Sequence, residues 1–182
     1  MSVTLRYYIK VFLLFGVGFA VGMHFLSLLF GDPNSLFKSL FHLTFFGGWM
    51  TLFTVPGKFK TIKSFGVTEI TPENLSIIQK RIVVSSLRKE DAIETIRHSK
   101  NFSKMNMRIK ENEIQLTSKF SWNLLGEKIT IGIEELDSGS SVYTIISRPR
   151  NIFQQVDSGQ NYKNVALIER LLGSPTGVFV AV

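Results

Sequence analysis

The chain has 182 residues, no cysteine and a net charge of +7 at pH 7. The absence of cysteine excludes disulfides, thiolate metal sites and a cysteine nucleophile. The apolar fraction of 45% is high for a soluble domain. The class of protein therefore depends on where the apolar residues lie along the chain.

The first predicted element is a membrane-spanning helix over residues 11–30. This stretch contains no Asp, Glu, Lys or Arg, and about 20 such residues can cross a hydrocarbon core of about 30 Å. Arg6 and Lys10 precede the run, and Ala20 and Gly22 form a pair of small residues, so the segment also fits a secretory signal peptide. We favour an uncleaved anchor because the apolar run continues well beyond this pair.

A second apolar run covers residues 37–55 and carries a single charge, on Lys38. Gly, Asp, Pro, Asn and Ser separate the two runs at residues 31–35, and each of these residue types favours a turn. The pattern predicts a two-helix transmembrane hairpin over residues 1–56. Basic residues flank both outer ends of the pair, which predicts a multi-pass protein of the inner (cytoplasmic) membrane with N- and C-termini in the cytoplasm.

Four glycines within the two runs indicate how the helices pack. Gly18 and Gly22 form a face of small residues on the first helix, and Gly47 and Gly48 lie in the second. Small residues let helix backbones approach closely in a membrane. We expect them to pack the hairpin together, with packing against another membrane protein as the alternative.

Two histidines are placed at about the same depth of the two runs, His24 near the end of the first and His42 near the start of the second. Facing imidazoles can bind haem iron or a metal, or they can form hydrogen bonds between helices. A lone hairpin cannot enclose a haem, so we expect hydrogen bonding and no cofactor, with a metal site at His24 and His42 as the alternative.

Beyond residue 56 the pattern predicts a basic linker over residues 57–79 and a cytoplasmic α+β domain over residues 80–182. Alternating apolar residues, as at Ile129, Ile131 and Ile133, indicate strands, and Val165, Ile168 and Leu172 form the stripe of a final helix. The expected order is strand, helix, four antiparallel strands and helix. This order is similar to a helix-grip or TATA-binding-protein-like layer, in which helices cover one face of an antiparallel sheet.

A polar cluster precedes the final helix. Asp157, Ser158 and Asn161 are types that cap helices, and Gly159 permits a tight entry. Capping is therefore the expected role. The alternative is an anion site at the helix N-terminus, and its candidate residues are Arg148, Arg150, Asp157, Gly159, Asn161 and Lys163.

Catalysis is the second alternative for the polar cluster. General acid–base catalysis by Asp157 needs a second carboxyl group nearby, and the candidates are Glu127, Glu134 and Glu135. The spacing along the chain does not bring these groups together. The sequence therefore predicts no catalytic residue, and no phosphate loop, metalloprotease or nucleophile-elbow motif is present.

Several short motifs in the C-terminal third of the chain are similar to a pattern in small uncharacterised bacterial membrane-anchored proteins. They are SW at Ser121–Trp122, GEKITI at residues 126–131, SRP at residues 147–149, and QxxDxGxN with a following Asn, from Gln154 or Gln155 to Asn164. An aromatic residue often follows the Asp in that pattern, whereas this chain has Ser158. The resemblance implies membrane anchoring and no known activity.

The sequence predicts a membrane-anchored, non-catalytic binding or scaffold module, which we expect to be a component or accessory subunit of a membrane protein complex. Expected partners are membrane lipid and a second protein or a second copy of the chain. The alternatives are a domain that binds a lipid or small molecule, and an enzyme that uses the polar cluster at Asp157. Nucleic-acid binding is not expected because the basic residues are dispersed and accompany no recognition motif.

Overall fold

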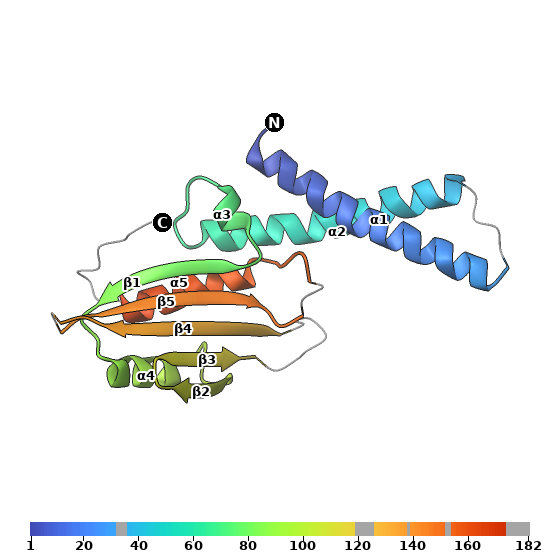
Figure 1. The fold of residues 1–182 in the computed structure, drawn as a ribbon. Coiled ribbons are helices and arrows are strands. Elements are labelled where there is room, and N and C mark those ends of the chain that lie inside the picture. Colours follow the sequence, from blue (N-terminus) through green and yellow to red (C-terminus); the bar gives the residue numbers. More distant parts are fainter. Residues whose placement is uncertain (32–35, 119–125, 138, 152–153, 174–182) are drawn as a thin grey trace. The chain divides into compact units, whose positions relative to one another are not determined.

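The computed structural model describes residues 1–31, 36–118, 126–137, 139–151 and 154–173. The chain divides into two compact units, Met1–Leu75 and Ser76–Val182. The described part of the first unit is helical, and the second combines helices with a five-stranded antiparallel sheet (Figure 1). The predicted α+β class is confirmed.

The first unit begins with helix α1 (Val3–Leu29), which is capped by the hydroxyl of Ser2 as it accepts the N–H of Leu5 at 3.2 Å. Among the described residues, α1 is the one helix long and apolar enough to cross a membrane, by length and composition. Its large apolar side chains are mostly exposed. Exposed apolar surface of this extent marks a contact with lipid or with another protein.

Helix α2 (Leu36–Lys63) contains the second predicted span. It does not reach the apolar content of α1, because Lys38 and His42 interrupt its apolar residues. The helix also continues through Pro56 into residues 57–63, where the sequence predicted a linker, and α3 (Pro72–Leu75) follows. The predicted linker is therefore partly helical.

Lys58 makes tertiary contacts in the part of α2 that follows its proline. Its ammonium group is buried, donates to the carbonyl of Leu75 at 2.9 Å and lies 5.4 Å from the ring centre of Tyr7. A charge-assisted hydrogen bond and a cation–π contact stabilise this turn of the helix. Lys58 is thus part of the packing of the first unit, whereas the sequence places it beside lipid headgroups.

Helices α1 and α2 are closest at Gly16 and Gly47. A Cβ atom on Gly47 would lie 2.8 Å from the carbonyl oxygen of Phe12, and one on Gly16 would lie 2.6 Å from that of Leu43. Along α1 the contacts advance from Phe12 to Gly16, while along α2 they go back from Gly47 to Leu43. The two helices therefore run antiparallel.

The other three glycines do not lie in this contact. A Cβ atom on Gly18, Gly22 or Gly48 would meet no described atom within 4 Å. Gly18 is two residues from Gly16, which turns it about 200° around the helix. The expectation that Gly18, Gly22 and Gly48 pack the helix pair is therefore wrong, whereas Gly47 does so.

The two histidines are not placed together. His42 lies edge-on to Phe19 with ring centres 5.8 Å apart, and its Nδ1 atom is buried without a hydrogen-bond partner. His24 is exposed and lies more than one turn further along α1. The described residues contain no group of three potential metal ligands.

The sheet of the second unit has the strand order β1-β5-β4-β3-β2, and all neighbours are antiparallel. The element order matches the sequence prediction. The elements are β1 (Gln79–Ser85), α4 (Lys89–His98), β2 (Asn106–Lys110), β3 (Glu113–Thr117), β4 (Glu127–Glu135), β5 (Ser141–Pro149) and α5 (Gln160–Leu172).

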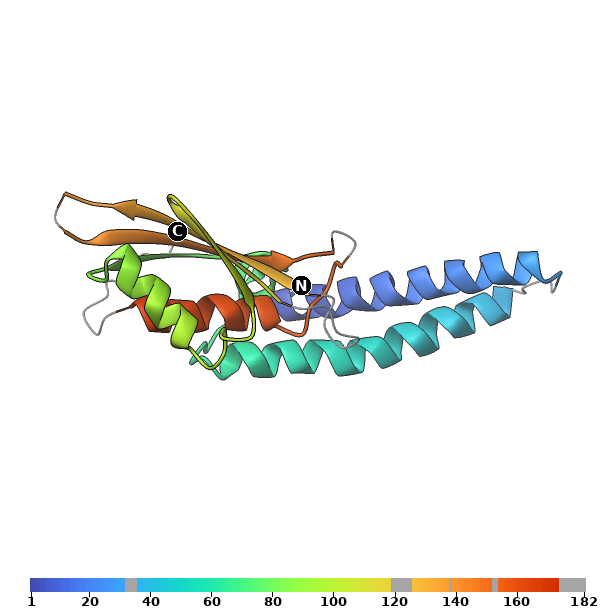
Figure 2. The ribbon, with the colours of Figure 1, turned by 90° about the horizontal axis from the view of Figure 1, so that it is seen from below.

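The core of this unit lies between the sheet and helices α4 and α5, which cover one face of it (Figure 2). Ile129, Ile131 and Ile133 alternate toward this core, as their spacing predicts. The intervening residues of the strands point to the opposite face, which no described helix of the second unit covers. We refer to this opposite side as the uncovered face.

Candidate functional site

A buried polar cluster lies on the helix-covered face of the sheet, where β5 meets α5. The hydroxyl of Ser147 donates to the side-chain oxygen of Asn161 at 2.8 Å, and Asn164 donates to the same hydroxyl at 3.2 Å. All three side chains are buried. Because buried polar groups are costly without partners, this network fixes α5 in register on the sheet.

Asp157 completes the cluster at the start of α5. Its carboxylate accepts the backbone N–H and the side-chain amide of Asn161 at 3.0 and 3.2 Å. Gly159 forms the N-cap with a φ of 91° and no side-chain hydrogen bond, so a glycine is needed there for the left-handed turn. Asp157 therefore satisfies an N–H group of the first turn, as the capping interpretation predicts.

Glu127 is the acidic residue that the fold brings to this cluster. Burial raises the pKa of its carboxyl group, and the charge of Asp157 raises that pKa further. Hydrogen bonds with the side chains of Ser118 and Asn164 act in the opposite direction. Glu134 and Glu135 are exposed at the far end of β4 and do not join the cluster.

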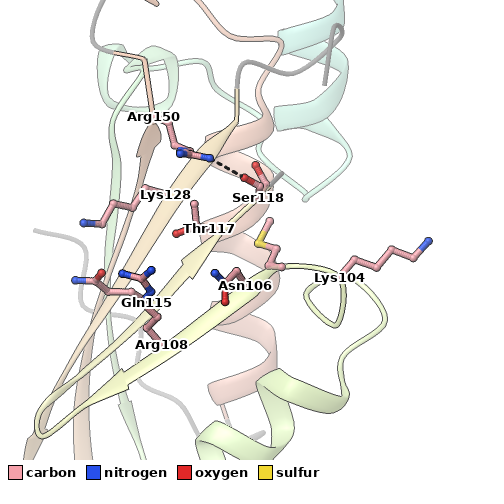
Figure 3. A pocket seen from close by; sticks show the side chains of 9 residues that line it. Lys104, Asn106, Arg108, Gln115, Thr117, Ser118, Lys128 and Arg150 are labelled. Carbon is pink, nitrogen blue, oxygen red and sulfur yellow. Dashed lines mark hydrogen bonds between the residues drawn. The ribbon is translucent and has the colours of Figure 1, made fainter. Parts of the chain in front are cut away.

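A separate cavity of about 700 Å³ lies on the uncovered face, over β2, β3 and the start of β4 (Figure 3). In the part of the chain that the structure describes, it is lined mainly by polar and basic side chains, with no acidic residue among them. Its cations are Lys104, Arg108, Lys128 and Arg150. In Figure 3 the side chain of Lys104 extends away from the other three, so Arg108, Lys128 and Arg150 form the centre of the site.

The Glu113 carboxyl group lies near the site: a hydrogen bond with Gln115 lowers its pKa, and the charge of Lys128 contributes to lowering it. Among the described residues none of the four cations of the cavity forms an ion pair. Lys128 instead lies directly opposite Arg148 on the neighbouring strand. Like charges in this position destabilise a sheet, so this end of the uncovered face carries an unfavourable concentration of positive charge.

Arg150 is held at the edge of the cavity by backbone contacts. Its N–H donates to the carbonyl of Gly126 at 3.0 Å, and its guanidinium donates to the carbonyl of Ser118 at 3.4 Å. Gly126 has a φ of 82°, and a Cβ atom there would lie 3.0 Å from the Cδ atom of Arg150. Gly126 thus permits both the turn and the close approach of the arginine.

The sheet separates the six residues of the predicted anion site into two groups. Asp157, Gly159 and Asn161 are buried on the helix-covered face, and Lys163 is exposed on α5. Arg148 and Arg150 belong to the uncovered face, because Ser147 points inward and side chains alternate along β5. The predicted single site at the helix N-terminus is therefore wrong, although Arg150 does line a basic cavity.

Sequence reasoning missed the remaining cations of the cavity. Lys104, Arg108 and Lys128 come from separate segments of the chain, and the pairing of β2 with β3 and of β3 with β4 brings them together. One feature of the sequence could have indicated them. Apolar and polar residues alternate along each strand, and this alternation places Arg108 and Lys128 on the polar face. Ser121 and Trp122 of the resemblance lie outside the described residues.

Comparison with models of protein families, with curated proteins and with solved structures finds no match.

Proposed function

We propose that the chain is a membrane-anchored, non-catalytic module that binds an anionic ligand on the uncovered face of its sheet. The observation that supports this proposal is the cavity whose described lining residues include four cations and no acidic side chain. Concave sites with a few convergent polar groups are where proteins bind small ligands. The ligand can be a small molecule, a lipid or a group carried by another subunit of a membrane complex.

The hydrogen bonding of the buried cluster supports a non-catalytic role. Asp157 caps α5, and Ser147, Asn161 and Asn164 are bonded to one another. A catalytic carboxylate must reach a substrate, whereas Asp157 is only 6% exposed. The cluster therefore supports the fold, and the cavity lies on the opposite face.

The anchor in this proposal is the pair of helices α1 and α2, as a transmembrane hairpin with both termini in the cytoplasm. Exposed aromatic side chains along α2, from Phe41 through Phe45 and Trp49 to Phe53, support contact with lipid. The placement of α4 and α5 on one face supports a helix-grip-like layer for the second unit. Membrane lipid and a protein partner, or a second copy of the chain, are the proposed neighbours.

The test is native mass spectrometry of the full chain extracted from its own membrane. The informative variant is Arg108→Gln/Lys128→Gln, and the matched control is Arg97→Gln/Lys100→Gln, which removes the same charge from exposed positions of α4 and the residues after it. We expect a mass bound to the wild type to be lost from the first variant and kept by the control. Retention of the same masses by all three proteins would refute a binding role for the uncovered face.

A further inference from the structure

We infer that the cavity of the uncovered face binds the phosphate group of an organic ligand, with Arg108, Lys128 and Arg150 as the binding cations. This inference rests on the proposed function and specifies the chemistry of its ligand. Its evidence is the charge, the hydrogen-bonding groups and the size of the cavity.

The charge of the site requires an anion. Lys128 and Arg148 are direct cross-strand neighbours of the same sign. At the other end of β2, by contrast, Lys110 lies opposite Glu113 and forms an ion pair at 3.6 Å. The same sheet thus pairs opposite charges at one end of β2 and places like charges side by side near the cavity. A bound anion would offset this repulsion.

A neutral side chain between the cations supplies a further donor. Gln115 lies opposite Arg108, but its amide nitrogen already donates to the Glu113 carboxylate. Thr117 lies opposite Lys128, so the middle strand β3 places a hydroxyl group beside the two charges. Arg108 can offer two parallel N–H groups, and Lys128 offers a compact positive charge. Together these groups match the several oxygens and the negative charge of a phosphate.

The size of the cavity indicates an organic phosphate. About 700 Å³ falls within the range of sites that hold small organic ligands, and it far exceeds the volume of a single inorganic ion. Arg150 is fixed beside Gly126 at the edge of this space, so less side-chain freedom is lost when it binds. The phosphate can belong to a lipid headgroup or to a soluble metabolite.

The experiment uses the full chain in nanodiscs of phosphatidylcholine, which has no net charge. Inorganic pyrophosphate is titrated by calorimetry in one arm, and vesicles containing phosphatidylglycerol are tested for binding in the other. We expect binding in at least one arm, and a loss of at least tenfold in affinity in Arg108→Gln/Lys128→Gln. The Arg97→Gln/Lys100→Gln control should bind as the wild type does.

A third variant, Arg108→Lys, keeps the charge and removes the fork of N–H groups, so we expect intermediate affinity. Far-UV circular dichroism verifies that each variant is folded. Binding of pyrophosphate supports a soluble phosphate, and binding of the vesicles alone supports a lipid headgroup. Absence of binding in both arms, or equal binding by the double variant and its control, overturns the inference. The proposed function would still stand if the double variant lost a native non-phosphate mass.

Discussion

At the scale of single residues, Glu127 has an energetic consequence that can be measured. Its raised pKa means that the folded chain binds the proton more tightly than the unfolded chain. This carboxyl group therefore stabilises the fold at low pH, and the contribution is lost as pH rises from about 4.5 through the folded-state pKa. We expect Glu127→Gln to remove this loss, because an amide is neutral and retains hydrogen-bonding capacity toward Asn164 and Ser118.

The measurement is the free energy of unfolding of the full chain in detergent, between pH 4 and pH 8. Urea unfolds the chain, and pulse proteolysis measures the fraction that is unfolded. Glu113 has a lowered pKa and acts in the opposite direction, so the informative quantity is the difference between wild type and variant. Relative to wild type, Glu127→Gln should gain stability as pH rises. A difference that is constant across this range would contradict a buried, titrating carboxyl group.

Residue types alone predicted part of this cluster. Asp157 is of a residue type that caps helices and stands just before α5. In the structure its carboxylate accepts the backbone N–H of Asn161 in the first turn. The approach of Glu127 and Asn164 was not predictable, because it depends on how β4 and α5 pack rather than on nearby sequence. The cations of the cavity were missed for the same reason, since their proximity depends on strand register.

At the scale of elements, the contact between α1 and α2 depends on Gly47. Replacing it by leucine would place a side chain against the backbone of Phe12, only 2.8 Å from the Cβ position. Overpacking of this kind costs about 1–3 kcal/mol. Gly48→Leu is the matched control, because its Cβ position has no described atom within 4 Å. We expect Gly47→Leu to separate the helices and Gly48→Leu to leave them packed.

The chain contains no cysteine, so a pair of introduced cysteines reports this contact without interference. The rings of Phe19 and Phe46 stack with centres 4.1 Å apart, so these two side chains meet across the contact, and Phe19→Cys/Phe46→Cys is the pair to test. The rate of disulfide formation in membranes should fall at least several-fold with Gly47→Leu. Equal rates in the Gly47→Leu and Gly48→Leu backgrounds would show that Gly47 does not define the contact.

Elements of the second unit were predictable because each follows from local pattern. The alternation of Ile129, Ile131 and Ile133 identifies β4, and the stripe of Val165 and Ile168 identifies α5. The end of α2 was not predictable, because Pro56 and the lysines after it suggest a break in the helix. A tertiary contact, the hydrogen bond from Lys58 to Leu75, accompanies the continuation of the helix.

At the scale of the whole molecule, the number of membrane crossings decides on which side the second unit lies. Helix α1 meets the criterion of length and composition for a span, and α2 does not. Both helices expose apolar side chains, so one crossing and two crossings are the arrangements to distinguish. With two crossings the residues before α1 and after α2 share one side, whereas with one crossing they lie on opposite sides.

Single cysteines at three positions distinguish these arrangements in intact cells. Ser2→Cys precedes α1, Phe30→Cys follows it at a position that is 82% exposed, and Ser64→Cys follows α2. For two crossings we expect an impermeant maleimide to label only Phe30→Cys until the membrane is permeabilised, since the basic residues at both outer ends predict a cytoplasmic location for them. Labelling of both Phe30→Cys and Ser64→Cys from outside, with Ser2→Cys protected, would instead establish a single crossing. The cavity would then face the outside of the cell, and its phosphate ligand would have to be found there.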